Sequence, residues 1–239
     1  VDSIIVGHFV GKEALAAVGI CNPITTLMIL FLNGLCMGAA ILMGMQYGAK
    51  DYDTLHRQIS TTMLSGVVFS VTLTVLCVIF AVPMLKLIQV DPSIMDLTAE
   101  YLRIIFWGLM FTFLYNFFSS TLRALGDSNS PLYFLIISAL LNIVLDLVLI
   151  IVFQMGAPGA AIATVVAQGI SGVLCLIYIM WKIPLLHLKK EDWHVGGQIY
   201  AIQLKIGLPM ALQYSITAIG TMMVQSAPVS YTHLRAHET

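Results

Sequence analysis

The chain has 239 residues, of which 59% are hydrophobic and only 10% are charged, and its mean hydropathy is +0.94. Soluble domains carry roughly 25% charged residues, so this composition excludes an ordinary soluble domain and indicates an integral membrane protein. A formal net charge of −1 without a basic run gives no support to a nucleic-acid-binding protein. The four cysteines stand singly in apolar runs, which argues against a metal or disulfide role.

The two ends of the chain are unusual. The sequence opens at Val1 in a membrane-like segment without an initiating Met, so we expect a first helix that has lost its beginning. Residues 228–239, PVSYTHLRAHET, bring two His, an Arg and a Glu directly after an apolar run. We expect these residues to be a non-native tail and leave them out of the functional interpretation.

Long stretches of sequence without charged residues predict the membrane helices. In chain order, the predicted elements are the end of a first helix at 1–9 and helices at 22–47, 58–85, 94–122, 131–153, 160–181 and 200–227. The fifth helix has a marked start, because Ser130 can cap unpaired amides and Pro131 suits a first turn. Residues 156–159, GAPG, predict a tight turn. No segment alternates like a barrel strand, so the predicted fold class is all-α, a polytopic transmembrane helix bundle.

The order of helices predicts two lobes. Six helices over residues 1–182 are followed by a polar linker at 183–199 and the first helix of a second lobe at 200–227. Repeated bundles are common among secondary transporters. The expected cytoplasmic side holds Lys50, Arg57, Arg123, Lys182, Lys189, Lys190 and Lys205, and the other side holds Lys12, Lys86 and Arg103.

An amide and a carboxylate lie inside the fifth predicted helix. Asn142 and Asp146 are four residues apart and share a helix face. A carboxylate in hydrocarbon is costly, and its default interpretation is a functional site; the alternative is a polar contact to a neighbouring helix. Asp2 and Asp146 fall roughly 10 Å below the outer surface, Thr164 roughly 7 Å and Asn142 roughly 16 Å. These side chains can therefore converge.

Two carboxylates in one dry pocket cannot easily both stay ionised, because desolvation and mutual repulsion disfavour the charged forms. Such a pair holds a proton, or binds a hard cation such as Na⁺ through its oxygens. The occupied site loses negative charge, and an ion that binds two conformations unequally shifts the equilibrium between them. Tyr115, Asn116 and Gln168 are further candidates for cavity or helix-contact polar groups, and Asn116 lies deeper than the carboxylates. Glycines such as Gly34 and Gly38 predict close helix packing.

Several motifs resemble the multidrug and toxic compound extrusion (MATE) family of transporters. They are VDSIIVGH at 1–8, LAAVG at 15–19, GAKD at 48–51, RALGDSNSP at 123–131, Asn142-x-x-x-Asp146, GAAIAT at 159–164 and GLP at 207–209. They occur in order over residues 1–226, and together they are specific although each alone is weak.

The resemblance implies the N-terminal half of a twelve-helix antiporter of the plasma membrane, built from two six-helix lobes. It implies export of organic cations and other amphipathic compounds against inward H⁺ or Na⁺, without a cofactor and without enzymatic activity. It places the H⁺ or Na⁺ site at Asp2, Asn142, Asp146 and Thr164. The partners it implies are the lipid bilayer, small organic substrates and the remaining C-terminal lobe. The chief departure is length, because about half of such a transporter is absent from this sequence.

Three alternatives stay open at this point. A lipid-linked oligosaccharide flippase of related architecture needs a cationic central cavity, for which only Arg103 is a candidate. An intramembrane aspartyl protease needs two carboxylates on neighbouring helices, but the Gly126-Asp127 pair lies in a predicted loop. A membrane scaffold leaves the two intramembrane carboxylates unexplained.

Overall fold

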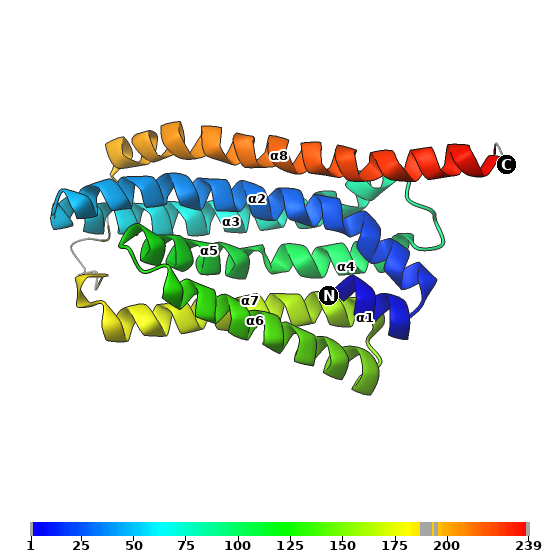
Figure 1. Cartoon of the computed structure of the whole chain (residues 1–239). Helices are drawn as coiled ribbons and strands as arrows, with labels where there is room; N and C mark the ends of the chain where they lie inside the picture. Colours follow the sequence, from blue (N-terminus) through cyan, green and yellow to red (C-terminus); the bar gives the residue numbers. More distant parts are fainter. Residues whose placement is uncertain (1, 187–192, 194–195, 238–239) are drawn as a thin grey trace.

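The computed structural model describes residues 2–186, 193 and 196–237, and the side chains at 218 and 221–237 lie outside the description. Within those residues the secondary structure is entirely helical, which confirms the predicted all-α bundle (Figure 1). The elements are α1 (Asp2–Phe9), α2 (Lys12–Gly48), α3 (Tyr52–Leu87), α4 (Met95–Trp107), α5 (Leu109–Ala124), α6 (Asn129–Leu147), the π-helix η1 (Val148–Val152), α7 (Gly156–Lys182), the 3₁₀-helix η2 (Pro184–Leu186) and α8 (Gly197–His237).

Five helical segments are long and apolar enough to cross a bilayer among the residues that the structure describes. They are α2, α3, α4 together with α5, α6 together with η1, and α7. The segments have 24 to 37 residues, and a crossing needs about 20. With eight residues, α1 is too short to cross. The helix α8 lies along α2 (Figure 1).

The predicted start of the second helix at residue 22 is wrong. The helix α2 begins at Lys12, and Pro23 lies inside it. The prediction ended the first helix at residue 9 and left residues 10–21 outside any helix. Val10 and Gly11 separate the two helices, and Gly11 has a φ of 121° that favours glycine. Proline removes one backbone hydrogen bond and bends a helix, and α2 changes direction in its N-terminal part (Figure 1).

The predicted fourth helix is one membrane span with a break at Gly108, which separates α4 from α5. A Cβ atom at this glycine would lie 2.4 Å from Cγ2 of Val165 on α7. The absence of a side chain at the break therefore lets α7 pack closely against the central span.

Two predicted helix starts are corrected. The segment 156–159 is the first turn of α7 rather than a turn before it, and Pro158 is tolerated there because amides in a first turn lack helical partners. Ser130 does not cap α6, because the helix begins at Asn129. Oδ1 of Asp127 accepts instead from the amide of Ser130 at 3.0 Å.

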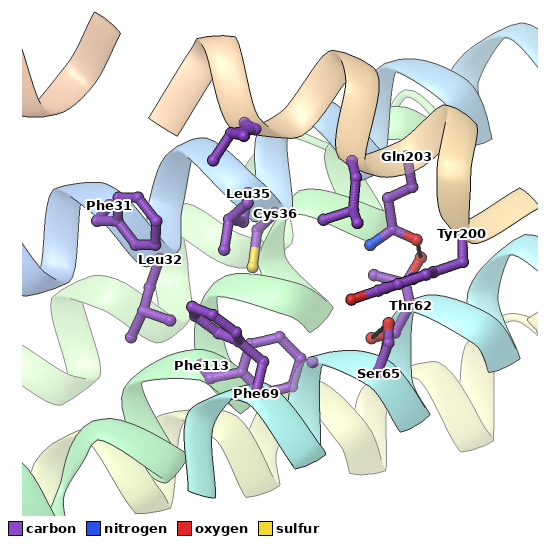
Figure 2. Close-up of a pocket in the computed structure, with 13 residues that line it drawn as sticks. Phe31, Leu32, Leu35, Cys36, Thr62, Ser65, Phe69, Phe113, Tyr200 and Gln203 are labelled. Atoms are coloured by element: carbon purple, nitrogen blue, oxygen red, sulfur yellow. Dashed lines mark hydrogen bonds between the residues drawn. The ribbon is translucent and has the colours of Figure 1, made fainter. Parts of the chain in front are cut away.

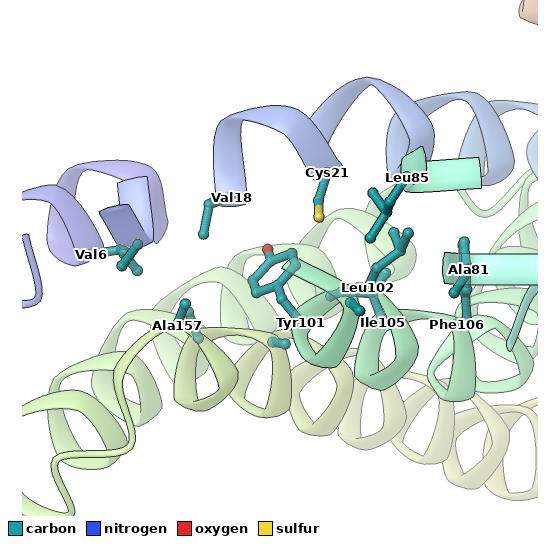
Figure 3. Close-up of a cluster of buried hydrophobic side chains, with 14 of the residues drawn as sticks. Val6, Val18, Cys21, Ala81, Leu85, Tyr101, Leu102, Ile105, Phe106 and Ala157 are labelled. Atoms are coloured by element: carbon teal, nitrogen blue, oxygen red, sulfur yellow. The ribbon is translucent and has the colours of Figure 1, made fainter. Parts of the chain in front are cut away.

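The core consists of two apolar clusters along the bundle. One surrounds Leu102 and Phe106 of α4 and receives Val6 from α1 and Leu85 from α3 (Figure 3). The other surrounds Phe117 of α5, nearer the ends where α2 and α5 finish. The central α4–α5 span packs against α2, α3 and α7. The buried sides of α2, α3 and α7 therefore point at this span, whereas α6 packs chiefly against α7.

The helices α2 and α8 cross closely through small residues. A Cβ atom at Gly34 would lie 2.4 Å from Cα of Ala211, and one at Gly38 would lie 2.4 Å from Cα of Gly207. Both helices thus present a small-x-x-x-small pattern, which lets backbones approach. This agrees with the packing role expected for Gly34 and Gly38.

Beside the crossing, α8 is bound to α3 by amide and hydroxyl groups. Nε2 of Gln58 donates to Oε1 of Gln203 at 3.2 Å and to Oγ1 of Thr62 at 3.1 Å. Figure 2 shows Gln203 and Thr62 at one end of a cavity of about 90 Å³ that is otherwise mainly apolar. The start of α8 is therefore fixed to the six-helix lobe by both close packing and hydrogen bonds.

The structure describes only part of the predicted linker at 183–199, of the predicted seventh helix at 200–227 and of the tail at 228–239. Residues 187–192 and 194–195 of the predicted linker lie outside the described residues. The predicted seventh helix at 200–227 is longer at both ends, because α8 runs from Gly197 to His237. The side chains of the expected non-native tail fall outside the description, so that expectation stays a prediction.

Candidate cation site

Asp146 on α6 is fully buried, with 0% of its surface exposed. Both of its carboxylate oxygens lack a hydrogen-bond partner within the described part of the chain. The π-helix η1 starts two residues later, and its last turn is closed by the amide of Phe153 donating to the carbonyl of Val148 at 3.1 Å. Such π-helical turns occur frequently at functional sites. A buried, unpartnered carboxylate is stable only when a proton or a cation compensates it.

A second carboxylate, that of Asp2, reaches the same place from α1. It is half-buried, and its Oδ2 accepts a hydrogen bond from the hydroxyl of Thr164 at 2.9 Å. It acts electrostatically on Asp146. Two acidic groups thus face one interior region.

Thr164 on α7 links three helices. Its Oγ1 accepts from Nδ2 of Asn142 on α6 at 3.3 Å and donates to Asp2 on α1. The same oxygen lies 3.1 Å from the carbonyl oxygen of Ala160, one turn earlier in α7. A threonine has a single hydroxyl proton, so Asp2 and this carbonyl compete for it. The hydroxyl is therefore placed to respond to any change of charge on Asp2.

Within the described part of the chain, no buried basic side chain compensates this site. Among the described residues, Asp146 is the one buried side chain of the Asp, Glu, Lys and Arg types. The two carboxylates, the Thr164 hydroxyl and the Asn142 carbonyl oxygen are the kinds of ligand that a hard cation prefers. The same carboxylates can instead share a proton. The donor set fits either ion.

Tyr101 on α4 belongs to this region and was missed by the sequence reasoning. It is buried, and its hydroxyl interacts electrostatically with Asp2, Cys21 and Asp146. Figure 3 shows this side chain projecting from α4 toward Val18 of α2. An aromatic residue in an apolar helix resembles any other core residue, so the sequence carries no signal for it.

The other expected polar residues lie apart from the four described above. The side-chain amide of Asn116 donates to the carbonyl of Thr112 in its own helix at 2.8 Å. Tyr115 lies in the apolar cluster around Phe117. Gln168 lies one turn along α7 from Thr164, and its Oε1 is buried without a partner among the described residues. Of these three, Gln168 is the nearest to Thr164 along its helix, and no hydrogen bond joins it to the four site residues among the described contacts.

A family model described as MatE matches residues 1–148, which is more than half of the chain. The chain belongs to the MatE family. The segment matched includes α1 and α6, and therefore Asp2, Asn142 and Asp146.

Curated relatives of this MatE chain are named as multidrug resistance proteins. Probable multidrug resistance protein YpnP of Bacillus subtilis is 32% identical over 240 residues, covering 97% of this chain and 52% of that protein. Probable multidrug resistance protein NorM of Thermotoga maritima is 26% identical over 230 residues, covering 93% and 48%. The chain spans about half the length of the curated relatives it matches.

Solved structures confirm the fold. A multidrug resistance MATE family transporter in an inward-facing conformation matches with a TM-score of 0.85 and 25% identity, over 91% of this chain and 50% of that one. A crystal structure of MATE in the bent conformation matches with a TM-score of 0.88 and 24% identity, over 96% and 51%. MatE relatives are multi-pass membrane transporters and not enzymes, so the intramembrane protease alternative is wrong.

Proposed function

We propose that this chain forms the first lobe, and the start of the second, of an antiporter that exports drugs and other organic amphipathic compounds across the plasma membrane. The observation that carries the proposal is the uncompensated Asp146 carboxylate beside Asp2 and Thr164. The names of the relatives support the substrate class, because several are multidrug resistance or multidrug export proteins.

The coupling step follows from the charges in the site. When H⁺ or Na⁺ binds between Asp146 and Asp2, their repulsion falls and the burial of Asp146 no longer opposes folding of this region. The hydrogen bond from Thr164 to Asp2 then changes in strength, and with it the packing of α1 on α7. A conformation in which these helices separate would bind the ion less tightly. The ion therefore shifts the equilibrium between two conformations by its unequal affinity for them.

Shifting a two-state equilibrium from 1:99 to 99:1 requires an affinity difference of about 10⁴-fold, or about 5.5 kcal/mol. The coupling ion must therefore bind the two conformations with affinities that differ by about this factor.

The export cavity requires more than the described lobe. The cavity between α3 and α8 measures about 90 Å³, whereas drug-sized sites measure roughly 300–1,000 Å³. The remaining C-terminal lobe, the partner expected from the sequence, would pack beside α8. The crossing of α2 and α8 and the bond from Gln58 to Gln203 support this arrangement.

The flippase alternative gains no support from the structure. Its recognition of pyrophosphate calls for basic side chains facing the interior. Arg103 is exposed, and no Lys or Arg is buried among the described residues.

The test is transport by the full-length protein that carries this chain as its first half. Purified transporter in proteoliposomes would receive inward gradients of H⁺ and Na⁺ separately, with ethidium efflux as the readout. We expect one gradient to drive efflux, and that gradient identifies the coupling ion. Efflux at the same rate after both gradients are collapsed would overturn the proposal.

A further inference from the structure

A groove runs over α5 on the outside of the bundle. The helices α3 and α7 both pack against α5 but have no extensive contact with each other. Between them lies a cavity of about 370 Å³, with Phe117 and Phe118 of α5 among its lining residues. Met63 of α3 and Met180 of α7 line opposite sides. The volume is in the range of ligand sites, roughly 300–1,000 Å³.

The lining offers a hydrocarbon surface with almost no polar group. Thr121 contributes a hydroxyl, but this group already donates to the carbonyl of Phe117 at 2.8 Å and lies 3.6 Å from the sulfur of Met43. The remaining polar atom of a lining side chain is the indole nitrogen of Trp193. Pockets for drug-sized compounds usually contain a few polar groups that orient the ligand. This groove therefore suits an alkyl chain better than a drug.

The groove opens toward the lipid. Leu176 and Met180 line it and are 39% and 53% exposed, within the membrane span α7. In a bilayer these surfaces are covered by acyl chains, because no water reaches this depth. The groove is therefore in contact with the acyl chains of the surrounding lipid.

Leu186 and Trp193, which follow α7 in the chain, line one end of the groove. Leu185 and Gly196 are hydrogen-bonded to α3. Nε2 of His56 donates to the carbonyl of Leu185 at 2.6 Å, and the amide of Gly196 donates to Oγ1 of Thr61 at 3.3 Å. Tryptophan is enriched at membrane interfaces, where its ring sits among head groups.

Two exposed basic residues lie within one helical turn of lining residues at this end, one on α3 and one on α7. Arg57 is exposed and lies two residues before the lining residue Ile59 on α3. Lys182 is exposed and lies two residues after Met180 on α7. Positive side chains next to the cytoplasmic surface attract anionic lipid head groups. These two positive charges favour an anionic phospholipid over a neutral one, although the exposed Asp51 also interacts with Arg57.

We propose that this groove binds one acyl chain of an anionic phospholipid from the cytoplasmic leaflet, with its head group held near Arg57, Lys182 and Trp193. The lipid joins α3, α5, α7 and the segment that leads to α8 through contacts outside the cation site. The proposal does not depend on the proposed antiport.

The first test is lipid retention by the purified chain in detergent, measured by native mass spectrometry during titration with phosphatidylglycerol. Met63→Trp fills the groove, and Val68→Trp is its control, because Val68 is on the same helix and 66% exposed. We expect a single lipid adduct that falls at least tenfold in Met63→Trp and is unchanged in Val68→Trp. Equal retention in both variants would overturn the proposal.

Two further measurements keep the proposal testable if Met63→Trp does not fold. Leu176→Trp against Val173→Trp, 54% exposed, repeats the comparison on α7. Phosphatidylglycerol with a photoreactive acyl chain should label peptides containing Phe117, Phe118 or Met180. Labelling spread evenly over the outside of the bundle would contradict a defined site. Equal retention of phosphatidylcholine with the same chains would contradict the head-group assignment.

Discussion

The hydroxyl of Thr164 lies 2.9 Å from Oδ2 of Asp2, although the two residues are 162 positions apart in the chain. The hydrogen bond connects the short helix α1 to α7 next to the buried Asp146. A change of charge at the carboxylates therefore acts directly on the packing of these helices.

Replacing Thr164 by valine keeps the shape and removes the hydroxyl. A hydrogen bond to a charged group contributes roughly 1.5–3 kcal/mol, so we expect the half-saturating ion concentration for efflux to shift about tenfold or more. For Na⁺ the required concentration should rise, because an oxygen ligand is lost. Thr164→Ser is the control, and a Thr164→Val protein identical to wild type would contradict the role of the hydroxyl.

Asp2 and Asp146 should act as a unit in transport. We expect Asp2→Asn and Asp146→Asn each to abolish coupled efflux and the double variant to be no worse than either single one, because residues of one unit have non-additive effects. Efflux rates normalised to the amount of protein in the membrane measure this. Losses that multiply in the double variant would mean that the carboxylates work independently.

The crossing of α2 and α8 depends on the missing side chain at Gly38. Gly38→Ala would place Cβ 2.4 Å from Cα of Gly207, so the helices must separate. Overpacking typically costs about 1–3 kcal/mol, and each kcal/mol corresponds to roughly 2–4 °C in Tm for a chain of this size. Gly44→Ala is the control on the same helix, because its nearest neighbour would lie at an ordinary 3.5 Å. A thermal unfolding scan in which both variants melt alike would contradict the packing.

Acid should weaken the loop between α5 and α6. Burial opposes the ionised form of Asp127, but hydrogen bonds from Ser130, Tyr178 and Asn129 prevail and hold the pKa of this carboxyl below its ordinary value. A lowered pKa adds stability above the unfolded value of about 4, and this stability is lost as pH falls through the folded value. We expect Asp127→Asn to lower stability at pH 7 and to reduce its loss between pH 5 and pH 2, measured by unfolding in detergent. An unchanged acid profile would show that these bonds do not contribute.

The fold was largely predictable because long apolar runs leave few alternatives to membrane helices. The errors lie at helix ends, because hydropathy alone does not determine the residue at which a helix begins. Charged residues near Lys12 obscured the first ten residues of α2, and Pro158 was taken for a turn although a first helical turn accepts proline. The cap of α6 was assigned to Ser130, but Asp127 has the longer reach and accepts the amide.

Only those residues of the candidate site that are polar within an apolar stretch of sequence could be predicted. Asp2, Asn142, Asp146 and Thr164 stand out in apolar sequence, and the rise per residue places them at similar depth. Tyr101 has no such signal, because only the packing of α4 brings its hydroxyl near the carboxylates. Their role in ion coupling stays a prediction.

The most direct measurement records ion entry and ethidium efflux together in the same proteoliposomes. Wild type would be compared with Asp146→Asn and with the control Asp91→Asn, whose carboxylate is exposed and accepts hydrogen bonds from the amide and the hydroxyl of nearby Ser93. We expect wild type and Asp91→Asn to move the ion and ethidium in a fixed ratio, and Asp146→Asn to move neither. The same ratio and rate in Asp146→Asn would contradict ion binding at this carboxylate.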